Sequence, residues 1–222
     1  MSERLSYLWY ETCYNAIFFG MTLGFSLRFE GRRNIPRTGP LLIVANHESY
    51  LDPLPIGVAF NRHLGFLARK TVMTGLLGSF LRSLNTHPVD QEGVAKEGLK
   101  TMIDMLRAGN AVLVFPEGQR SFDGRMGEFK PGVLLLIRKT RPPVIPVGVA
   151  GVFEALPRTR KPPIPTPSPL FLPAGPSTIS VSVGRPLDGG RLAEMPREKA
   201  LGELEGAVKV VQERAERLRR KV

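Results

Sequence analysis

The run Leu-Leu-Ile-Val-Ala-Asn-His at residues 41–47 decides the fold, because five successive apolar residues end abruptly in two polar ones. A second run of the same kind, Ala-Val-Leu-Val-Phe at 111–115, ends in Pro-Glu-Gly-Gln-Arg-Ser at 116–121. Neither run alternates with polar residues, so both faces of each strand should be covered by other elements. The two runs therefore predict an α/β fold whose mostly parallel or mixed central sheet is flanked by helices.

Short β-like runs alternate with helical stretches along the whole chain from residue 31 onward. The predicted strands cover residues 41–45, 65–68, 111–115, 144–149 and 178–183. The predicted helices cover residues 53–60, 93–107, 131–139 and 196–221. This alternation predicts one domain over residues 31–222, preceded by an N-terminal helical segment over residues 1–30.

A proline-rich loop interrupts the pattern between residues 157 and 176, where eight of the twenty prolines lie. Proline lacks a backbone N–H and fixes φ, so this stretch is neither a helix nor a central strand. Two interpretations stay open. The favoured one is a plain surface connection, and the other is a semi-rigid flap whose apolar tip, Leu170-Phe171-Leu172, touches lipid.

Composition limits the classes of partner and of site. The 222 residues carry a formal net charge of +11, which favours a polyanionic partner such as an anionic membrane surface. No nucleic-acid-binding signature accompanies that charge, so we expect no nucleic acid partner. The single cysteine, Cys13, excludes a disulfide framework and favours a reducing compartment, and three scattered histidines lack zinc-ligand spacing. We therefore expect no metal site.

The N-terminal segment is rich in aromatic residues, with eight of the chain's seventeen in its first 29 positions. The uncharged run at 12–27 is shorter than the roughly 20 residues of a bilayer span, and Glu3 argues against a signal peptide. We expect helices in the membrane interface, with a spanning helix as second choice; the alternative is a helix packed on the protein's own core. The candidate anchors are Tyr7, Trp9, Tyr10, Tyr14, Phe18 and Phe19.

His47 and Asp52 form the first candidate pair for chemistry. A spacing of five residues would place them on different faces of a helix, so a loop has to bring them together. Asp52-Pro53 suits the end of such a loop, because Asp is a favoured N-cap and Pro a favoured first helical residue. The carboxylate would then orient the imidazole as a general base. The alternative is that Asp52 only caps a helix and His47 is an incidental turn residue.

The turn after residue 115 supplies Glu117 and Arg120 around the flexible Gly118. Arginine suits a bidentate grip on phosphate, and Glu117 could orient that arginine or accept from acceptor hydroxyls, whereas the alternative is a surface salt bridge. Both polar turns follow predicted strands, and ligands of open α/β sheets bind beyond the carboxyl ends of strands. The sequence has no Gly-x-Ser-x-Gly elbow, so we expect the base to act on a substrate group.

These residues resemble the glycerolipid acyltransferase family that includes the 1-acylglycerol-3-phosphate, or lysophosphatidate, acyltransferases. Residues 46–52 match the family's Asn-His-x-x-x-x-Asp motif, and residues 115–121 match its Phe-Pro-Glu-Gly-Thr-Arg-Ser motif except at Gln119. Weaker matches lie at 68–70, 129–132 and 144–147. One position departs from the family, because Gln91 stands where an arginine usually follows an aspartate.

The resemblance implies that His47 takes the proton of an acceptor hydroxyl as it attacks an acyl thioester, while Asp52 steadies the imidazolium. The donor would be acyl-CoA or acyl carrier protein, and no cofactor would be needed. The implied substrate-binding residues are Asn46, Glu117, Gly118, Arg120 and Ser121, with Lys70 and Lys130 as further cations.

The implied reaction is the acylation of lysophosphatidate to phosphatidate in phospholipid biosynthesis, on the cytoplasmic face of a membrane, by a peripheral or monotopic protein. Three alternatives remain open at this point. The acceptor is another lysolipid or glycerol 3-phosphate, or the base acts on water, or the chain is a catalytically decayed basic membrane-binding homologue.

Overall fold

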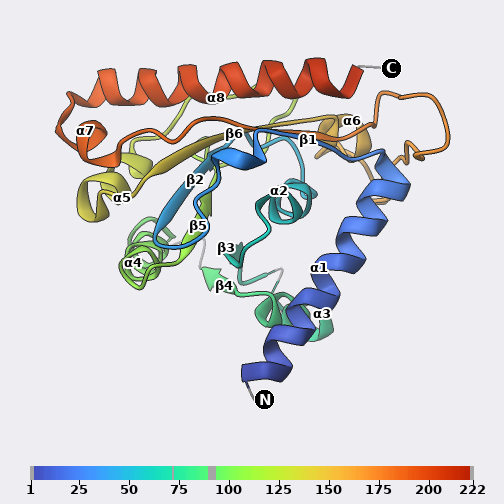
Figure 1. The fold of residues 1–222 in the computed structure, drawn as a ribbon, viewed down its shortest axis with the longest axis horizontal. Helices are drawn as coiled ribbons and strands as arrows, with labels where there is room; N and C mark the ends of the chain where they lie inside the picture. The colour runs from blue at the N-terminus through green and yellow to red at the C-terminus, as the bar shows by residue number, and fades with distance from the viewer. Residues whose placement is uncertain (1–2, 72, 90–93, 221–222) are drawn as a thin grey trace.

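In the computed structural model, which describes residues 3–71, 73–89 and 94–220, helices cover both faces of a seven-stranded sheet (Figure 1). The strands are β1 (Arg28–Glu30), β2 (Leu41–Ala45), β3 (Leu64–Arg69), β4 (Thr86–Val89), β5 (Ala111–Val114), β6 (Val144–Ala150) and β7 (Ser180–Val183). Their order is β1-β7-β6-β2-β5-β3-β4, and every neighbouring pair is parallel except β6 and β7. The predicted mixed α/β sheet is therefore confirmed.

The helices are α1 (Glu3–Phe25), α2 (Pro53–Phe60), α3 (Gly75–Ser83), α4 (Val94–Arg107), α5 (Gly132–Thr140), α6 (Val152–Ala155), α7 (Gly189–Glu194) and α8 (Arg197–Arg220), with a 3-10 turn η1 (Arg32–Asn34). All five predicted strands and all four predicted helices are present. Sequence analysis missed both edge strands: β4 contains Pro88, which an edge strand tolerates, and the three residues of β1 were assigned to the N-terminal segment.

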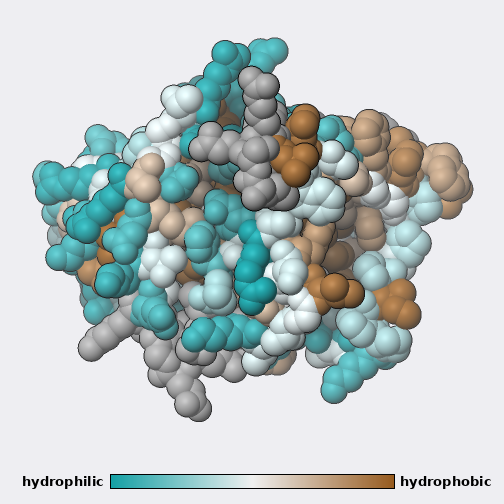
Figure 2. Space-filling view, turned by 90° about the horizontal axis from the view of Figure 1, so that it is seen from below, coloured by the Kyte–Doolittle hydropathy of each residue, from teal (hydrophilic) through white to brown (hydrophobic). Residues whose placement is uncertain are grey.

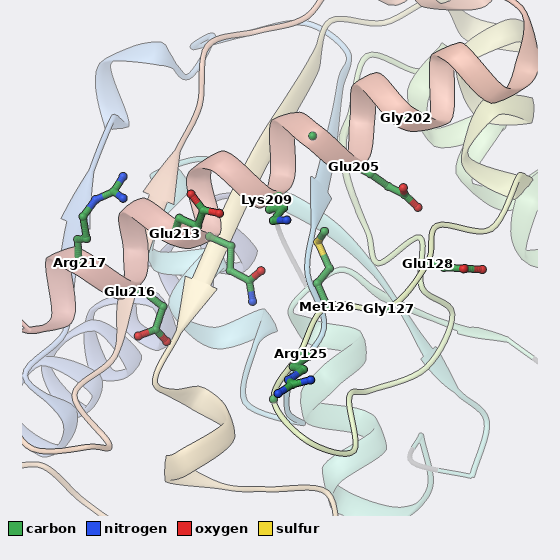
Figure 3. Close-up of a pocket in the computed structure, with 13 residues that line it drawn as sticks. Arg125, Met126, Gly127, Glu128, Gly202, Glu205, Lys209, Glu213, Glu216 and Arg217 are labelled. Atoms are coloured by element: carbon green, nitrogen blue, oxygen red, sulfur yellow. The ribbon is translucent and has the colours of Figure 1, made fainter.

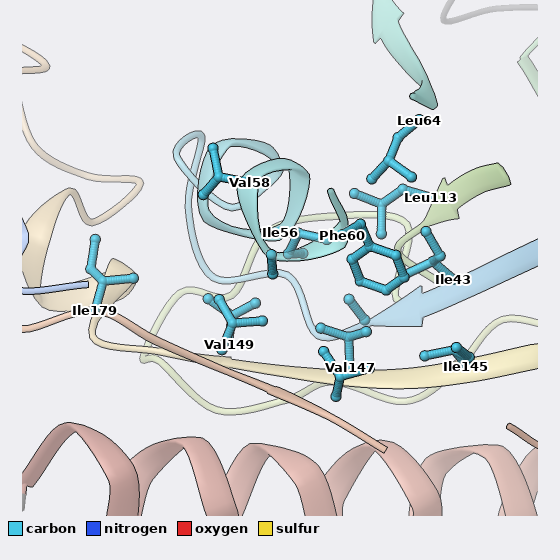
Figure 4. Packing of buried hydrophobic residues seen from close by; sticks show 14 of the residues in the cluster. Ile43, Ile56, Val58, Phe60, Leu64, Leu113, Ile145, Val147, Val149 and Ile179 are labelled. Atoms are coloured by element: carbon cyan, nitrogen blue, oxygen red, sulfur yellow. The ribbon is translucent and has the colours of Figure 1, made fainter. Parts of the chain in front are cut away.

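The side chains of β2 show why its apolar run does not alternate. Leu41, Ile43 and Ala45 belong to a core shared with α1 and α2, whereas Leu42 and Val44 belong to a second core shared with α4, α5, α7 and α8. Figure 4 shows the first core, in which Ile56 and Phe60 of α2 lie over the strands. All five β2 residues are fully buried, so the strand fixes both layers at once.

Helix α8 runs along the sheet, on the face opposite α1 and α2 (Figure 1). Gly148 of β6 makes this close approach feasible, because a Cβ there would lie 2.2 Å from backbone atoms of Val211 and Gln212. Only glycine leaves room for the helix backbone at that point.

Helix α1 packs one side against the body and leaves another exposed. The Tyr14 hydroxyl donates to the carbonyl of Val58 at 2.8 Å, and Tyr10 stacks on His63 with ring centroids 3.8 Å apart. Phe18 is partly buried against the first core. These three predicted membrane anchors instead contact the protein body.

Trp9 and Phe19 remain exposed, although the Trp9 indole donates to Ser83 at 2.9 Å, and the Tyr7 side chain lies outside what the structure describes. Leu5, Leu8 and Leu23 are exposed on the same helix. Within the described ranges, no helix is both long and apolar enough to cross a bilayer.

Replacing Gly148 by Ala should lower the free energy of unfolding by about 1–3 kcal/mol, because the added methyl group overlaps the backbone of α8. Gly202→Ala is the matched control, since a Cβ at that helical glycine meets nothing within 4 Å and should be neutral or stabilising by up to about 1 kcal/mol. Urea unfolding of both variants measures the difference. Equal stability of the two variants would contradict the packing described for α8.

Candidate active site

The two polar turns that sequence analysis singled out lie side by side and are bonded to each other. Strands β2 and β5 are parallel neighbours, so the segments that follow them leave the same edge of the sheet. The backbone N–H of Ser121 donates to the carbonyl of His47 at 2.8 Å. The predicted shared site at the carboxyl ends of the strands is therefore present in the fold.

Asp52 organises the turn that contains His47. Its Oδ2 lies 2.7 Å from Nδ1 of His47 and also accepts from the backbone N–H groups of Glu48 at 2.7 Å and Ser49 at 2.9 Å. Pro53 begins α2 as predicted, but the Asp52 side chain makes no capping bond to that helix. Because the carboxylate turns back onto the loop, its role is to shape the loop and to hold the imidazole.

Burial of the contact between Asp52 and His47 disfavours the charged form of the carboxyl group. The Asp52 side chain has no exposed surface, and burial raises its pKa, while His47 and the two backbone donors oppose that rise. Among the described residues, Asp52 Oδ1 has no hydrogen-bond partner. The three contacts at Oδ2 therefore have to replace the hydration that the buried carboxylate loses. A carboxylate facing Nδ1 selects the tautomer with the proton on that nitrogen and leaves the Nε2 lone pair as the base.

The imidazole of His47 is fixed by its surroundings on several sides. Its ring stacks on Phe115, with centroids 4.0 Å apart and an interplanar angle of 13°. Its backbone N–H donates to Glu117 Oε1 at 2.8 Å. About a fifth of the side chain stays exposed, so a substrate can still reach the ring.

Glu117 supports His47 rather than facing the solvent. Its second oxygen accepts from the backbone N–H of Gly127 at 2.8 Å, and the side chain is buried. Burial raises the pKa of Glu117, and the two backbone donors counter that effect. Both carboxylate oxygens are thus engaged with backbone, and the predicted contact of Glu117 with acceptor hydroxyls stays a prediction.

Asn46 extends the sheet by one side chain. Its Oδ1 accepts from the N–H of Val149 at 2.9 Å, and its Nδ2 donates to the Val149 carbonyl at 3.0 Å. The buried carboxamide therefore imitates a peptide group and ties the end of β2 to β6. This position is structural in the described fold, although the resemblance placed Asn46 among the substrate contacts.

Glu48 is a buried carboxyl group that sequence analysis did not single out. Its Oε1 accepts from Asn46 at 3.0 Å and from Gln212 of α8 at 3.2 Å, and its Oε2 accepts from the N–H of Phe153 at 3.3 Å. Burial, and next the nearby charge of Asp52, raise the pKa of Glu48 well above its usual value. A glutamate inside a recognised motif gave a sequence signal, but two of its donors, Phe153 and Gln212, are remote in the chain.

Four further predicted residues lie around the second turn. The guanidinium carbon of Arg120 lies over the exposed ring of Tyr50, 3.4 Å from its centroid. Gly118 has φ +71°, and a Cβ there would lie 3.0 Å from the ammonium of Lys130. The Ser121 hydroxyl donates to Asp123 at 3.1 Å. Arg120 and Lys130 thus place positive charge beside the His47 turn.

Lys70 is the remaining cation that the resemblance implied. Lys70 directly follows β3, which parallels β5, so it leaves the sheet at the same edge. Gln91, where the resemblance expected an arginine, lies outside the described residues. Within the described part of the chain, no group of three or more histidine, cysteine or acidic residues is arranged to hold a metal ion.

Two hollows adjoin these turns. One, of about 790 Å³, is lined by Glu117, Arg120, Lys130 and Arg197 among others. The other, of about 850 Å³, lies between the loop at 124–128 and α8, as Figure 3 shows. Gln212, which donates to Glu48, lines this second hollow.

A buried carboxylate that orients a partly exposed histidine, at the carboxyl end of a mostly parallel sheet, is the arrangement of an enzyme that uses a general base. Residues 26–150, more than half of the chain, match the Acyltransferase family. The chain belongs to this family and is an acyltransferase-type enzyme, as the resemblance predicted.

Several relatives are similar to this chain. It is 23% identical over 201 residues to the 1-acyl-sn-glycerol-3-phosphate acyltransferase of Bacillus subtilis, covering 90% of this chain and 92% of that protein. It is 34% identical over 119 residues to a probable enzyme of that name from Mycoplasma genitalium, covering 50% of this chain and 44% of the relative. This second match therefore spans less than half the relative's length.

A solved structure has the same fold over the whole chain. The crystal structure of the 1-acyl-sn-glycerophosphate (LPA) acyltransferase PlsC from Thermotoga maritima superposes with a TM-score of 0.78 and 26% sequence identity. The match covers 100% of this chain and 85% of the other. The helices on both sides of the sheet are therefore common to the two proteins.

Glu48→Gln should change how stability depends on pH. In the folded chain the pKa of Glu48 lies well above 4.5, so its favourable contribution is complete below the unfolded pKa and is lost as the pH rises through the folded pKa. The variant cannot ionise there, so its free energy of unfolding should gain on the parent as the pH rises above the unfolded-state pKa of about 4.3. Exposed Glu128→Gln is the control. A pH-independent difference for Glu48→Gln would contradict the assigned burial cost.

Proposed function

We propose that this protein transfers a fatty acyl group from a thioester donor to the hydroxyl of lysophosphatidate, giving phosphatidate for phospholipid biosynthesis. The observation that carries the proposal is the 2.7 Å contact between His47 Nδ1 and the buried Asp52 carboxylate. Membership of the Acyltransferase family and the names of the relatives support the choice of reaction and acceptor.

In the proposed reaction, Nε2 of His47 takes the proton from the acceptor hydroxyl as its oxygen attacks the thioester carbonyl. The new C–O bond forms, the C–S bond breaks, and the departing sulfur receives the proton from the imidazolium. Asp52 stabilises the positive ring between these two steps. A thiol has a pKa of about 8.5 and leaves readily, so we propose direct transfer without a cofactor.

The donor proposed here is acyl-CoA or acyl carrier protein, and the acceptor phosphate would meet the cations around the second turn. Arg120 is the leading candidate, because its cation–π contact with Tyr50 holds the guanidinium beside the His47 turn. Lys130 and Lys70 supply further positive charge at the same sheet edge. The contribution of Gly118 and Ser121 would be to shape this turn.

We further propose that the enzyme works as a peripheral or monotopic protein on the cytoplasmic face of a membrane and has no nucleic acid partner. A net charge of +11 favours an anionic lipid surface. The exposed side chains of Trp9, Phe19 and Leu23 on α1 offer apolar contact with it.

His47→Ala should lower turnover by roughly 10²- to 10⁴-fold, because the acceptor hydroxyl loses its general base. The assay follows labelled acyl-CoA into phosphatidate with the detergent-solubilised enzyme. His87→Ala is the matched control, since His87 lies on the edge strand β4 and contacts Asn85. Retained turnover in a folded His47→Ala variant would sink the mechanism, and labelled fatty acid released equally without acceptor would indicate a hydrolase.

Arg120→Ala should raise the KM for lysophosphatidate roughly tenfold to a hundredfold, which corresponds to the about 1.5–3 kcal/mol of a charge-assisted hydrogen bond. Turnover of a monoacylglycerol, which lacks the phosphate, should change little. Arg125→Ala serves as control, because that side chain is almost fully exposed and pairs only loosely with Asp123 at 3.8 Å. An equal loss for both acceptors would exclude phosphate binding as the role of Arg120.

A further inference from the structure

The proline-rich loop at residues 157–176 carries an exposed apolar tip at residues 170–172. Leu170, Phe171 and Leu172 are 52%, 82% and 55% exposed, and Ile164 of the same loop is 65% exposed. Soluble surfaces rarely present contiguous large apolar side chains in this way unless they bind something. The Acyltransferase family match ends at residue 150, so this loop lies beyond it.

The loop is bonded to the C-terminal end of α1. The backbone N–H groups of Ser168 and Leu170 donate to the carbonyls of Gly24 at 2.8 Å and Leu23 at 3.0 Å, and the Ser26 hydroxyl donates to the Ser168 carbonyl at 2.8 Å. These bonds satisfy carbonyls that a helix end otherwise leaves unpaired. They also place the tip beside Leu23, which is itself 56% exposed.

Further contacts fix the loop at its middle and at its end. Midway along the loop, the N–H of Thr166 donates to the carbonyl of Ala155 at 2.7 Å. At its end, the buried guanidinium of Arg219 on α8 donates to the carbonyl of Pro176 at 2.5 Å. The tip is therefore presented in a set conformation, so binding costs little ordering entropy.

Charge around the tip selects the kind of partner. Between Glu154 and Asp188 the sequence has no acidic residue and four basic ones, which are Arg158, Arg160, Lys161 and Arg185. Figure 2 shows hydrophobic side chains gathered on the side of the molecule where α1 and the loop lie, while the opposite side of that face is largely hydrophilic. Apolar side chains in a basic segment fit an anionic lipid surface.

The start of the loop also reaches the candidate active site. The guanidinium of Arg158 lies 4.1 Å from the ring centroid of Phe122, and its Nη1 donates to the carbonyl of Arg120 at 3.3 Å. The same loop thus contacts both the end of α1 and the turn that carries Arg120. A membrane held by the tip would therefore meet a loop that is bonded to the candidate active site.

We propose that Leu170, Phe171 and Leu172, together with Leu23 at the end of α1, form a second membrane-docking surface that inserts among anionic lipids. This surface deepens the membrane association proposed above and favours the second sequence interpretation of the loop, a flap whose tip touches lipid, over a plain connection. It predicts that α1 alone does not supply the full affinity for lipid.

The first test measures co-sedimentation of the full chain with vesicles of equal parts phosphatidylglycerol and phosphatidylcholine. Replacing all three tip residues by Ser should lower the partition coefficient roughly tenfold or more, because their apolar surface no longer transfers from water. Val210→Ser is the matched control, since Val210 is exposed on α8 and lies outside this surface. Unchanged vesicle binding by the tip variant would overturn the proposal.

The second test does not depend on a disruptive substitution. A Phe171→Cys variant is labelled with an environment-sensitive dye, and Cys13 stays unlabelled because it is buried. The emission should shift to the blue on adding anionic vesicles, while the same label in Val210→Cys should not respond. An unchanged emission from the label at position 171 would overturn the proposal. So would a blue shift that arises from self-association of the protein, which sedimentation velocity without lipid detects.

Neither binding measurement requires turnover, so the proposed docking surface and the proposed acyl transfer are tested independently of each other. Vesicle binding through the tip without acyl transfer would leave the surface intact and refute the reaction. If both hold, the tip variant should lose activity on acceptor embedded in vesicles and keep its activity on a short-chain, water-soluble lysophosphatidate.

Discussion

A single buried oxygen, Oδ2 of Asp52, determines the shape of the candidate active site. It collects three donors, the imidazole of His47 and the backbone N–H groups of Glu48 and Ser49. A buried carboxylate is tolerated only when such partners replace water, so the loop has to close around it. That closure brings together two residues five positions apart and fixes which nitrogen of the histidine is the base.

The surrounding fold holds this loop by contacts from three directions. Glu117 and Phe115 support His47 from the neighbouring turn, and Asn46 ties the end of β2 to β6. On the remaining side, Gln212 of α8 reaches Glu48 across the sheet edge. Asn46 and Phe115 directly follow the buried strands β2 and β5, and Gln212 lies on α8, so regular elements position these supports. The cost is a second buried carboxyl group, Glu48, beside the first.

The periphery follows a different principle from the core. Several aromatic side chains of helix α1 pack against the rest of the protein, as Tyr14 does through its hydrogen bond to Val58. Another side of the helix is apolar and exposed. The proline-rich loop satisfies the carbonyls at the end of that helix and holds its own apolar tip out. In the proposed function, chemistry and lipid contact therefore lie in separate parts of one small protein, joined through Arg158 at the turn of Arg120.

The sequence by itself determined the central strands, because uninterrupted apolar runs such as residues 41–45 are buried on both faces whatever surrounds them. It also predicted a loop that pairs His47 with Asp52, with a plain helix cap as the alternative, and the nearness of the second turn, since parallel strands bring their carboxyl ends to one edge. Only the tertiary structure decided which groups engage Glu117, Asn46 and Glu48. Their partners are Gly127, Val149 and Gln212, and contacts so distant along the chain leave no local pattern of spacing or polarity. The sequence also shows the apolar residues 170–172. Only the folded chain places them beside the end of α1, and the proposed docking surface depends on that placement.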